Sequence, residues 1–225
     1  MSFGIEVFGR REWAARAAQL IAATLPGARA VVLTGGDAAA NLYPELAKID
    51  NDWSQSEVLF SDERCVPPDD PASNFRLADE LLLSLRPTGR VHRIRGEDPP
   101  SKAAEDYSRA IAGLMERGPD VMLLGLGADA HIAALFPASP LFDDDTDWAR
   151  AVNRPDGLAG VTLTPRSLVR AKRVFLVVAG AAKADAVKRA VRGHEEPRTC
   201  PVRLLAGHPD ATFLLDEAAA TALAE

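Results

Sequence analysis

The sequence predicts an α/β protein in which helices flank a mainly parallel, open sheet in a Rossmann-like, three-layer arrangement. Short apolar runs alternate with Ala-rich helical patterns from end to end, as expected for repeated βαβ units. The runs at 121–124 (VMLL) and 173–179 (RVFLVVA) are apolar almost throughout, which is typical of strands buried on both faces. No internal repeat or low-complexity linker divides the chain, so we expect a single domain over residues 1–225.

Strands and helices are expected to alternate through the first half of the chain. The expected strands lie at 5–8, 30–34, 57–61 and 91–94. The expected helices lie at 11–25, 38–48, 75–85 and 101–117. Pro26-Gly27 ends the first of these helices, and Ser101 is the expected N-cap of the last. Three prolines between 62 and 74 predict a loop with a rigid path.

The second half continues this pattern and adds a small accessory hairpin. The expected strands lie at 121–124, 148–153, 161–164, 173–179 and 212–215. We expect the second and third of these to pair across the turn at 154–157. Helices are expected to begin at Thr164-Pro165, at Gly180 and at Asp216, with Thr164 and Asp216 as N-caps. The acidic segment 142–147 predicts a solvated loop.

Composition excludes several classes of protein. A net charge of −6 and a pI near 5.3 leave no basic patch for a nucleic-acid backbone, so no nucleic-acid partner is expected. The two cysteines, Cys65 and Cys200, have neither disulfide-framework nor zinc-site spacing, which fits a reduced, cytoplasmic location. The N-terminus has no signal-peptide pattern, and no apolar run is long enough to cross a membrane.

The stretch at 120–137 (DVMLLGLGADAHIAALFP) carries the strongest chemical signal. A buried strand ends in Gly125-Leu126-Gly127, and Asp129 and His131 follow at the strand's carboxyl end, where ligands bind in open α/β sheets. A carboxylate and an imidazole two residues apart on a glycine-rich turn are an acid/base candidate. A lone His is more often structural. The hexapeptide 125–130 also matches the dinucleotide fingerprint, but Pro137 arrives too early for the helix that such a site needs.

Three further segments at strand ends are candidates for binding an anion. The Thr34-Gly35-Gly36 turn aims N–H groups and a helix start forward, although it equally fits a plain βα turn. Arg64, beside Asp62 and Glu63, is either a solvated ion-pair cluster or a rigid clamp for phosphate or carboxylate. Lys183 stands at a helix start, where a cation is unfavourable; it either points into water or faces an anionic ligand.

Together these stretches resemble a known enzyme family over nearly the whole chain. The segments that carry the resemblance are Leu33-Thr34-Gly35-Gly36, Asp62-Glu63-Arg64 with Val66-Pro67 and Ser73-Asn74, the run 124–131 with Leu135-Phe136-Pro137, Val161-Thr162-Leu163-Thr164, and the run 180–184. In this order they resemble the 6-phosphogluconolactonase family in its bacterial single-domain form, within the glucosamine-6-phosphate isomerase-like superfamily. The order makes the match specific, since each segment alone is a weak signal.

The resemblance implies hydrolysis of 6-phospho-D-glucono-1,5-lactone to 6-phosphogluconate in the oxidative pentose phosphate pathway. It implies His131 as general base, Asp129 as the group that orients it, and N–H groups of a glycine turn at the oxyanion. The residues implied to contact the substrate are Thr34, Gly35, Gly36, Asp62, Arg64, Gly127 and Lys183. No cofactor or metal is implied. We expect a small-molecule sugar-phosphate lactone as the partner, and a monomer or weak homodimer.

Three positions depart from the family's pattern. Ala130 stands where relatives commonly have Gly, which would exclude a backbone conformation that favours glycine and could displace His131. Asp37 stands where a hydroxyl is frequent and would repel a phosphate unless it caps its own helix. Gly160 stands where many relatives have Arg, so the anion is expected to rest more heavily on Arg64 and Lys183.

Two other functions are open at this point. Glucosamine-6-phosphate deaminase/isomerase shares the fold, but its members resemble Asp-Glu-Tyr and Phe-Asn-Glu-Pro where this chain has Asp62-Glu63-Arg64 and Leu135-Phe136-Pro137. The missing Glu removes a group that ring-opening chemistry would use. A non-catalytic sugar-phosphate sensor is the other alternative, although no helix-turn-helix segment for DNA binding is visible.

Overall fold

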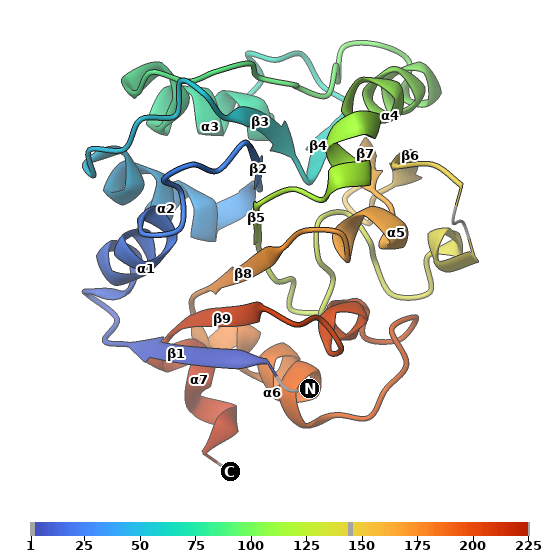
Figure 1. Cartoon of the computed structure of the whole chain (residues 1–225). Helices are drawn as coiled ribbons and strands as arrows, with labels where there is room; N and C mark the ends of the chain where they lie inside the picture. Colours follow the sequence, from blue (N-terminus) through green and yellow to red (C-terminus); the bar gives the residue numbers. More distant parts are fainter. Residues whose placement is uncertain (1–2, 144–145, 225) are drawn as a thin grey trace.

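A computed structural model describes residues 3–143 and 146–224, and within them the chain forms two sheets (Figure 1). The large sheet has six strands, all paired in parallel, in the order β1-β9-β8-β5-β2-β3. Its strands are β1 (Gly4–Phe8), β2 (Ala30–Leu33), β3 (Glu57–Phe60), β5 (Val121–Leu124), β8 (Arg173–Val178) and β9 (Ala211–Asp216). The small antiparallel sheet has the order β4-β7-β6: β4 (Asp62–Arg64), β7 (Ala159–Leu163) and β6 (Ala149–Asn153).

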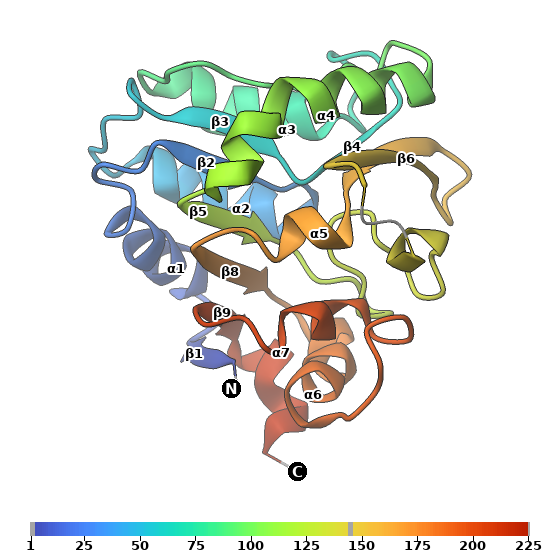
Figure 2. The same ribbon diagram turned by 45° about the vertical axis from the view of Figure 1, so that its right-hand side comes forward.

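Helices flank the large sheet, which confirms the predicted fold class (Figure 2). The α-helices are α1 (Trp13–Ala22), α2 (Gly36–Ala47), α3 (Asn74–Leu81), α4 (Pro100–Arg117), α5 (Pro165–Leu168), α6 (Ala184–Arg192) and α7 (Glu217–Ala220). Short 3-10 helices lie at Leu83–Leu85, Pro140–Asp143, Ala181–Lys183, Pro201–Leu205 and Thr221–Leu223. The helix α2 packs against α1 and α3, whereas α4 packs against β6 and β7 of the small sheet. No helix in the described part of the chain is long and apolar enough to cross a membrane.

The core forms around the central strands that the apolar runs predicted. Every residue of β2 and β5 is buried, as is all of β8 after Arg173. By contrast β1 lies at the edge of the sheet, beside β9 alone, and its residues are largely exposed. The central position of β5 matters for function, because the loop with Asp129 and His131 begins where this rigid strand ends.

The small sheet differs from the expectation in one important respect. The segment Asp62–Arg64 is a strand, whereas a loop was expected there, because it pairs with β7 of the predicted hairpin. Ser61 joins the two sheets: its N–H donates to Leu33 O, and its carbonyl accepts the N–H of Leu163. The small sheet therefore continues directly from the carboxyl end of β3, and Arg64 stands on paired backbone.

Several local expectations are corrected or confirmed. Residues 91–94 form no strand, since only Val91 bridges to Val58. Ser101 is not the N-cap of α4, which begins at Pro100 after Pro99. Thr164 stands at the N-cap of α5, but its hydroxyl donates to Asp147 O instead of capping.

The hairpin of β6 and β7 and the cap of α7 are confirmed. Asp216 Oδ1 accepts the N–H of Ala219 at 2.7 Å and also that of Gly180 at 2.9 Å. The predicted acidic loop at 142–147 includes residues 144–145, which lie outside the described residues, and its start belongs to the 3-10 helix Pro140–Asp143.

Candidate functional site

A cavity of about 300 Å³ lies at the carboxyl ends of β2, β5 and β8. The predicted residues that line it are Thr34, Gly35, Gly36, Asp62, Arg64, Gly127, His131 and Lys183. Asp129 does not line the cavity, but it is hydrogen-bonded to His131, which does. The structure therefore brings together, in one place, predicted side chains and turns from four separate parts of the sequence.

A larger cavity, of about 1300 Å³, opens at the opposite, amino ends of β2 and β5, around Ala30 and Asp120. Its lining includes no histidine or cysteine, and Asp120 is already occupied by the N–H groups of Arg29 and Ala30 and by Lys172. Size alone would favour this cavity, but the convergent acid/base and cationic groups lie in the smaller one.

The imidazole of His131 is oriented by Asp129. Nδ1 of His131 lies 2.6 Å from Asp129 Oδ1, and the same oxygen accepts the backbone N–H of His131 at 3.1 Å. Partial burial acts to raise the pKa of Asp129, but the hydrogen bonds and charge of His131 hold that pKa below its ordinary value of 3.8. Asp129 is therefore ionised near neutral pH, and it leaves Nε2 of His131 as the ring nitrogen that can accept a proton.

The loop that carries His131 is a tight turn with unusual backbone. Ala130 has φ 71°, so it does adopt the left-handed conformation that it was expected to exclude, and His131 lines the cavity. The N–H of Ala130 donates to Gly127 O, and the N–H of Gly127 donates to His131 O. Ala133 and Ala138 also have positive φ, at 51° and 60°. Each such residue costs about 1–2 kcal/mol, which the packing of the loop offsets.

The two glycine turns contact each other across the end of the sheet. The N–H of Gly125 donates to Thr34 Oγ1 at 3.4 Å, and both backbone groups of Thr34 are bonded to the buried Tyr43 hydroxyl. The N–H groups of Gly125 and Gly127 are both donated inside the protein, so of the two glycine turns this one offers neither N–H group to an oxyanion. The start of α2 at Gly36 lines the cavity instead, with the unbonded N–H groups of a first helical turn.

Gly35 is required by the packing of the first turn. A methyl group at Gly35 would lie 1.7 Å from the Oδ1 atom of Asn74, whose side chain is buried against the turn. Asp37 is exposed at the cavity, and its carboxylate does not cap α2. Asp37 was expected to repel a phosphate unless it capped its own helix. Because it does not cap α2, that repulsion is still expected.

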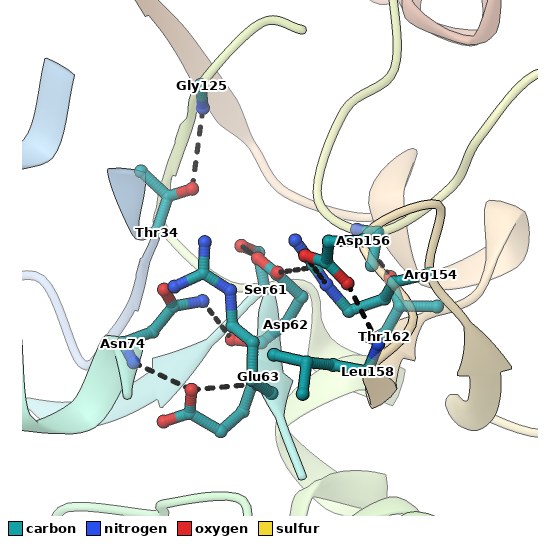
Figure 3. A network of polar contacts seen from close by, with 12 residues as sticks. Thr34, Ser61, Asp62, Glu63, Asn74, Gly125, Arg154, Asp156, Leu158 and Thr162 are labelled. Atoms are coloured by element: carbon teal, nitrogen blue, oxygen red, sulfur yellow. Dashed lines mark hydrogen bonds and ion pairs between the residues drawn. The ribbon is translucent and has the colours of Figure 1, made fainter. Parts of the chain in front are cut away.

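Arg64 is held in place by a buried carboxylate next to it. Glu63 accepts hydrogen bonds from the N–H groups of Arg64, Asn74 and Phe75 and from the Ser73 hydroxyl, which ties β4 to the start of α3. Figure 3 shows the bond between Asn74 and Glu63. Burial raises the pKa of Glu63 even though these four donors oppose the shift. The guanidinium of Arg64 donates to Ala72 O at 2.6 Å, which fixes its path to the cavity.

Lys183 reaches the cavity from the 3-10 turn that leads into α6. It forms no ion pair with any residue of the described chain, and it is only partly exposed. An ammonium group with no carboxylate partner at the edge of a cavity is available to an anionic ligand.

Among the residues that line the cavity, the polar side chains of Asn74 and Arg154 were not predicted as site residues. Arg154 belongs to the turn of the β6–β7 hairpin, and its side chain is 9% exposed. It pairs with Asp156 at 3.1 Å and with Asp62 at 3.5 Å (Figure 3). No local pattern pointed to it, because an Arg followed by Pro in a turn is ordinarily exposed.

Comparison with known proteins shows the family of this chain. The family model described as glucosamine-6-phosphate isomerases/6-phosphogluconolactonase matches residues 10–214. A 6-phosphogluconolactonase of Mycobacterium tuberculosis is 33% identical over 88% of this chain and 86% of its own length. A probable chloroplastic 6-phosphogluconolactonase of Oryza sativa is 36% identical over 73% of this chain, and the match spans only 57% of that relative.

Solved structures show the same fold throughout the chain. A 6-phosphogluconolactonase from Trypanosoma cruzi has a TM-score of 0.86 and 25% identity, over 99% of this chain and 98% of that one. A monomeric glucosamine-6-phosphate deaminase has a TM-score of 0.87 at 19% identity, over 98% of this chain and 100% of that one. The fold is therefore shared by both activities, and only the groups in the cavity can distinguish them.

Proposed function

Because the chain belongs to the family of glucosamine-6-phosphate isomerases and 6-phosphogluconolactonases, we propose that it hydrolyses 6-phospho-D-glucono-1,5-lactone to 6-phosphogluconate. One observation supports this most directly. His131, Arg64 and Lys183 line a single cavity, so a base and two cations converge where a phosphorylated sugar lactone could bind.

The proposed reaction is attack of water on the lactone carbonyl. Nε2 of His131 takes a proton from the water as the new C–O bond forms, a contribution of about 10²- to 10⁴-fold in rate. Asp129, which is ionised near neutral pH, stabilises the imidazolium that results. The ring C–O bond then breaks, and the proton passes to the departing ring oxygen, which gives the open-chain acid.

The charge that develops on the carbonyl oxygen needs donors. We assign this role to the N–H groups at the start of α2, because those of Gly125 and Gly127 are donated within the protein. The phosphate is held by Arg64 and Lys183, which approach from the small sheet and from the start of α6. Asp62, Gly35 and Thr34 shape the wall between these groups.

We further propose a monomer or weak homodimer as the active form. A cytoplasmic location is also proposed, and it rests on the two cysteines, Cys65 and Cys200, which are both free thiols in the described chain. Sedimentation of the purified protein would test the first of these proposals.

The decisive experiment uses freshly made 6-phosphogluconolactone. Product formation by the parent protein is expected to exceed the spontaneous rate clearly, and His131→Asn is expected to lose at least about 10²-fold in kcat. His194→Asn is the matched control, since His194 is exposed and does not line the cavity. Equal rates for the parent and His131→Asn would overturn the catalytic role and favour a sugar-phosphate sensor.

The deaminase alternative is tested with the same preparations. The absence of a Glu in Leu135-Phe136-Pro137 argues against ring-opening of an amino sugar phosphate. We therefore expect no ammonia release from glucosamine 6-phosphate. Ammonia release that depends on His131 would replace the proposed reaction with the deaminase reaction.

A further inference from the structure

The glycine at position 160 leaves a space beside Arg64. Arg64 on β4 and Gly160 on β7 are paired residues of neighbouring antiparallel strands, so side chains at these two positions point to the same face of the small sheet. Gly160 contributes no side chain to that face. A side chain from elsewhere can therefore lie next to Arg64.

Arg154 fills this space. A methyl group at Gly160 would lie 3.0 Å from Arg154 Cδ, 3.0 Å from the backbone Glu63 O and 3.4 Å from Arg154 Cγ, which is tighter than most Cβ contacts in proteins. The hairpin brings Arg154 there, because β6 pairs with β7 and the turn folds the Arg154 side chain back over Gly160. The side chain of Arg154 is 9% exposed, and it lines the same cavity as Arg64.

Contacts on several sides hold the guanidinium. Nε of Arg154 donates to Asp156 Oδ2, while Asp156 Oδ1 accepts the N–H of Leu158 and so fixes that carboxylate in the turn (Figure 3). The guanidinium also lies over the ring of Phe136, 5.6 Å from its centroid. Its stem is packed and its direction is set, as recognition of a charged group requires.

Two arginines that line one wall repel each other unless an anion lies between them. Slight burial acts to raise the pKa of Asp156. The N–H of Leu158 and the charges of Arg154 and Arg64 outweigh it and hold this pKa below its ordinary value of 3.8. Both arginines therefore act on this carboxylate. Asp156 is itself exposed, and Asp62 lies 3.5 Å from Arg154, too far for a strong hydrogen bond. Donors of both guanidiniums therefore remain for a ligand.

From this arrangement we propose that Arg154 is a specificity-determining residue that holds the phosphate of the substrate together with Arg64, and that glycine at position 160 is what admits it. This rests on the proposed function for the identity of the anion. The ring of Phe136 contacts both groups, since its centroid lies 4.6 Å from that of the His131 ring and 5.6 Å from the guanidinium carbon of Arg154. Arg154 lies over Gly160, the strand partner of Arg64, and is therefore suited to the same group that Arg64 is assigned to hold, the phosphate.

The test compares two substrates that differ only in the phosphate. For Arg154→Gln we expect kcat/KM on 6-phosphogluconolactone to fall about 10- to 100-fold, since hydrogen bonds to charged groups contribute on that order. On unphosphorylated glucono-1,5-lactone we expect no change. Arg109→Gln, an exposed arginine of α4 outside the cavity, is the matched control and should alter neither value.

A rescue variant separates recognition from a structural role. Gly160→Arg in an Arg154→Ala background, which lacks the Cγ and Cδ atoms that a side chain at 160 would meet, returns a guanidinium to the face beside Arg64. We expect it to restore at least part of the selectivity that Arg154→Ala loses. Arg154→Lys keeps the charge and the pairing with Asp62 and Asp156, so it should fold even if Arg154→Gln does not. It should still lose selectivity, because an ammonium cannot form the two-pronged contact.

Binding of the product by calorimetry distinguishes this inference from the proposed function. We expect Arg154→Lys and Arg154→Gln to bind 6-phosphogluconate more weakly than the parent and to bind gluconate as the parent does, whether or not the parent hydrolyses the lactone. Unchanged binding of 6-phosphogluconate, or an equal loss on both substrates, would overturn the role of Arg154 while leaving the lactonase proposal intact.

Discussion

The two halves of the cavity are built in different ways. The catalytic half, His131 with Asp129, stands on an irregular loop whose geometry is set within a few neighbouring residues. The anion-binding half, Arg64 with Arg154, stands on a small sheet whose geometry is set by pairing between strands far apart in the sequence. We infer that one methyl group can disrupt the catalytic half, whereas the anion-binding half depends on long-range packing.

The largest expected effect comes from Gly127→Ala. A methyl group at Gly127 would lie 2.0 Å from His131 Nδ1 and 2.5 Å from Asp129 Oδ1, so it would push the pair apart. These atoms end flexible side chains, so the fold should survive while kcat falls at least about 10²-fold, as misplaced catalytic groups do. Steady-state kinetics and calorimetric binding of 6-phosphogluconate would check that only the catalytic half is affected.

Gly125→Ala in the same turn is the matched control for Gly127→Ala. A methyl group at Gly125 would lie 3.8 Å from Gly35 O, an ordinary contact, so its loss in kcat should be far smaller. Similar losses for the two variants would show that the turn is merely intolerant of side chains and would remove the contrast between the halves.

A second, smaller effect is expected at Glu63, whose hydrogen bonds hold β4 of the anion-binding half against the start of α3. In Glu63→Gln the amide NH₂ replaces an oxygen that accepted hydrogen bonds from backbone N–H groups, so donor faces donor. This should lower the unfolding free energy by about 1–3 kcal/mol. Urea unfolding would measure this change. Glu80→Gln, in an exposed ion pair on α3, is the control and should change little.

The pH dependence of this difference follows from the raised pKa of Glu63. The pKa of Glu63 in the folded protein lies above the ordinary 4.5, so as the pH falls the folded chain binds this proton before the unfolded chain does. Above the folded-state pKa, Glu63 is charged and its burial disfavours the folded state. The parent should therefore gain stability relative to Glu63→Gln as the pH falls through that pKa toward 4.5. A difference that shrinks over the same range would contradict the direction of the shift.

The smallest effect is expected for Ala130→Gly. Relief of the left-handed backbone contributes about 1–2 kcal/mol, but loss of a buried methyl group and a more flexible unfolded chain oppose it. The unfolding free energy should change by less than about 1 kcal/mol. Ala138→Gly, at an exposed position with φ 60°, has no buried methyl group to lose and should be the more stable of the two variants. The reverse order would show that backbone strain does not limit this loop.

Much of this molecule was predictable from local sequence patterns. The apolar runs at 121–124 and 173–179 identified two central strands, because only a strand covered on both faces lacks polar alternation. The glycine turns after β2 and β5 and the pair Asp129 and His131 followed from the same logic, since parallel strands place their carboxyl ends at one edge.

Other features were decided only by the tertiary structure. Asp62–Arg64 became a strand because β7, far along the sequence, supplies its partner. Arg154 entered the cavity because Gly160, on a neighbouring strand, leaves room for it. Local patterns report what a segment prefers in isolation. Which side chain fills a space beside another depends on contacts between residues that only the folded chain brings together.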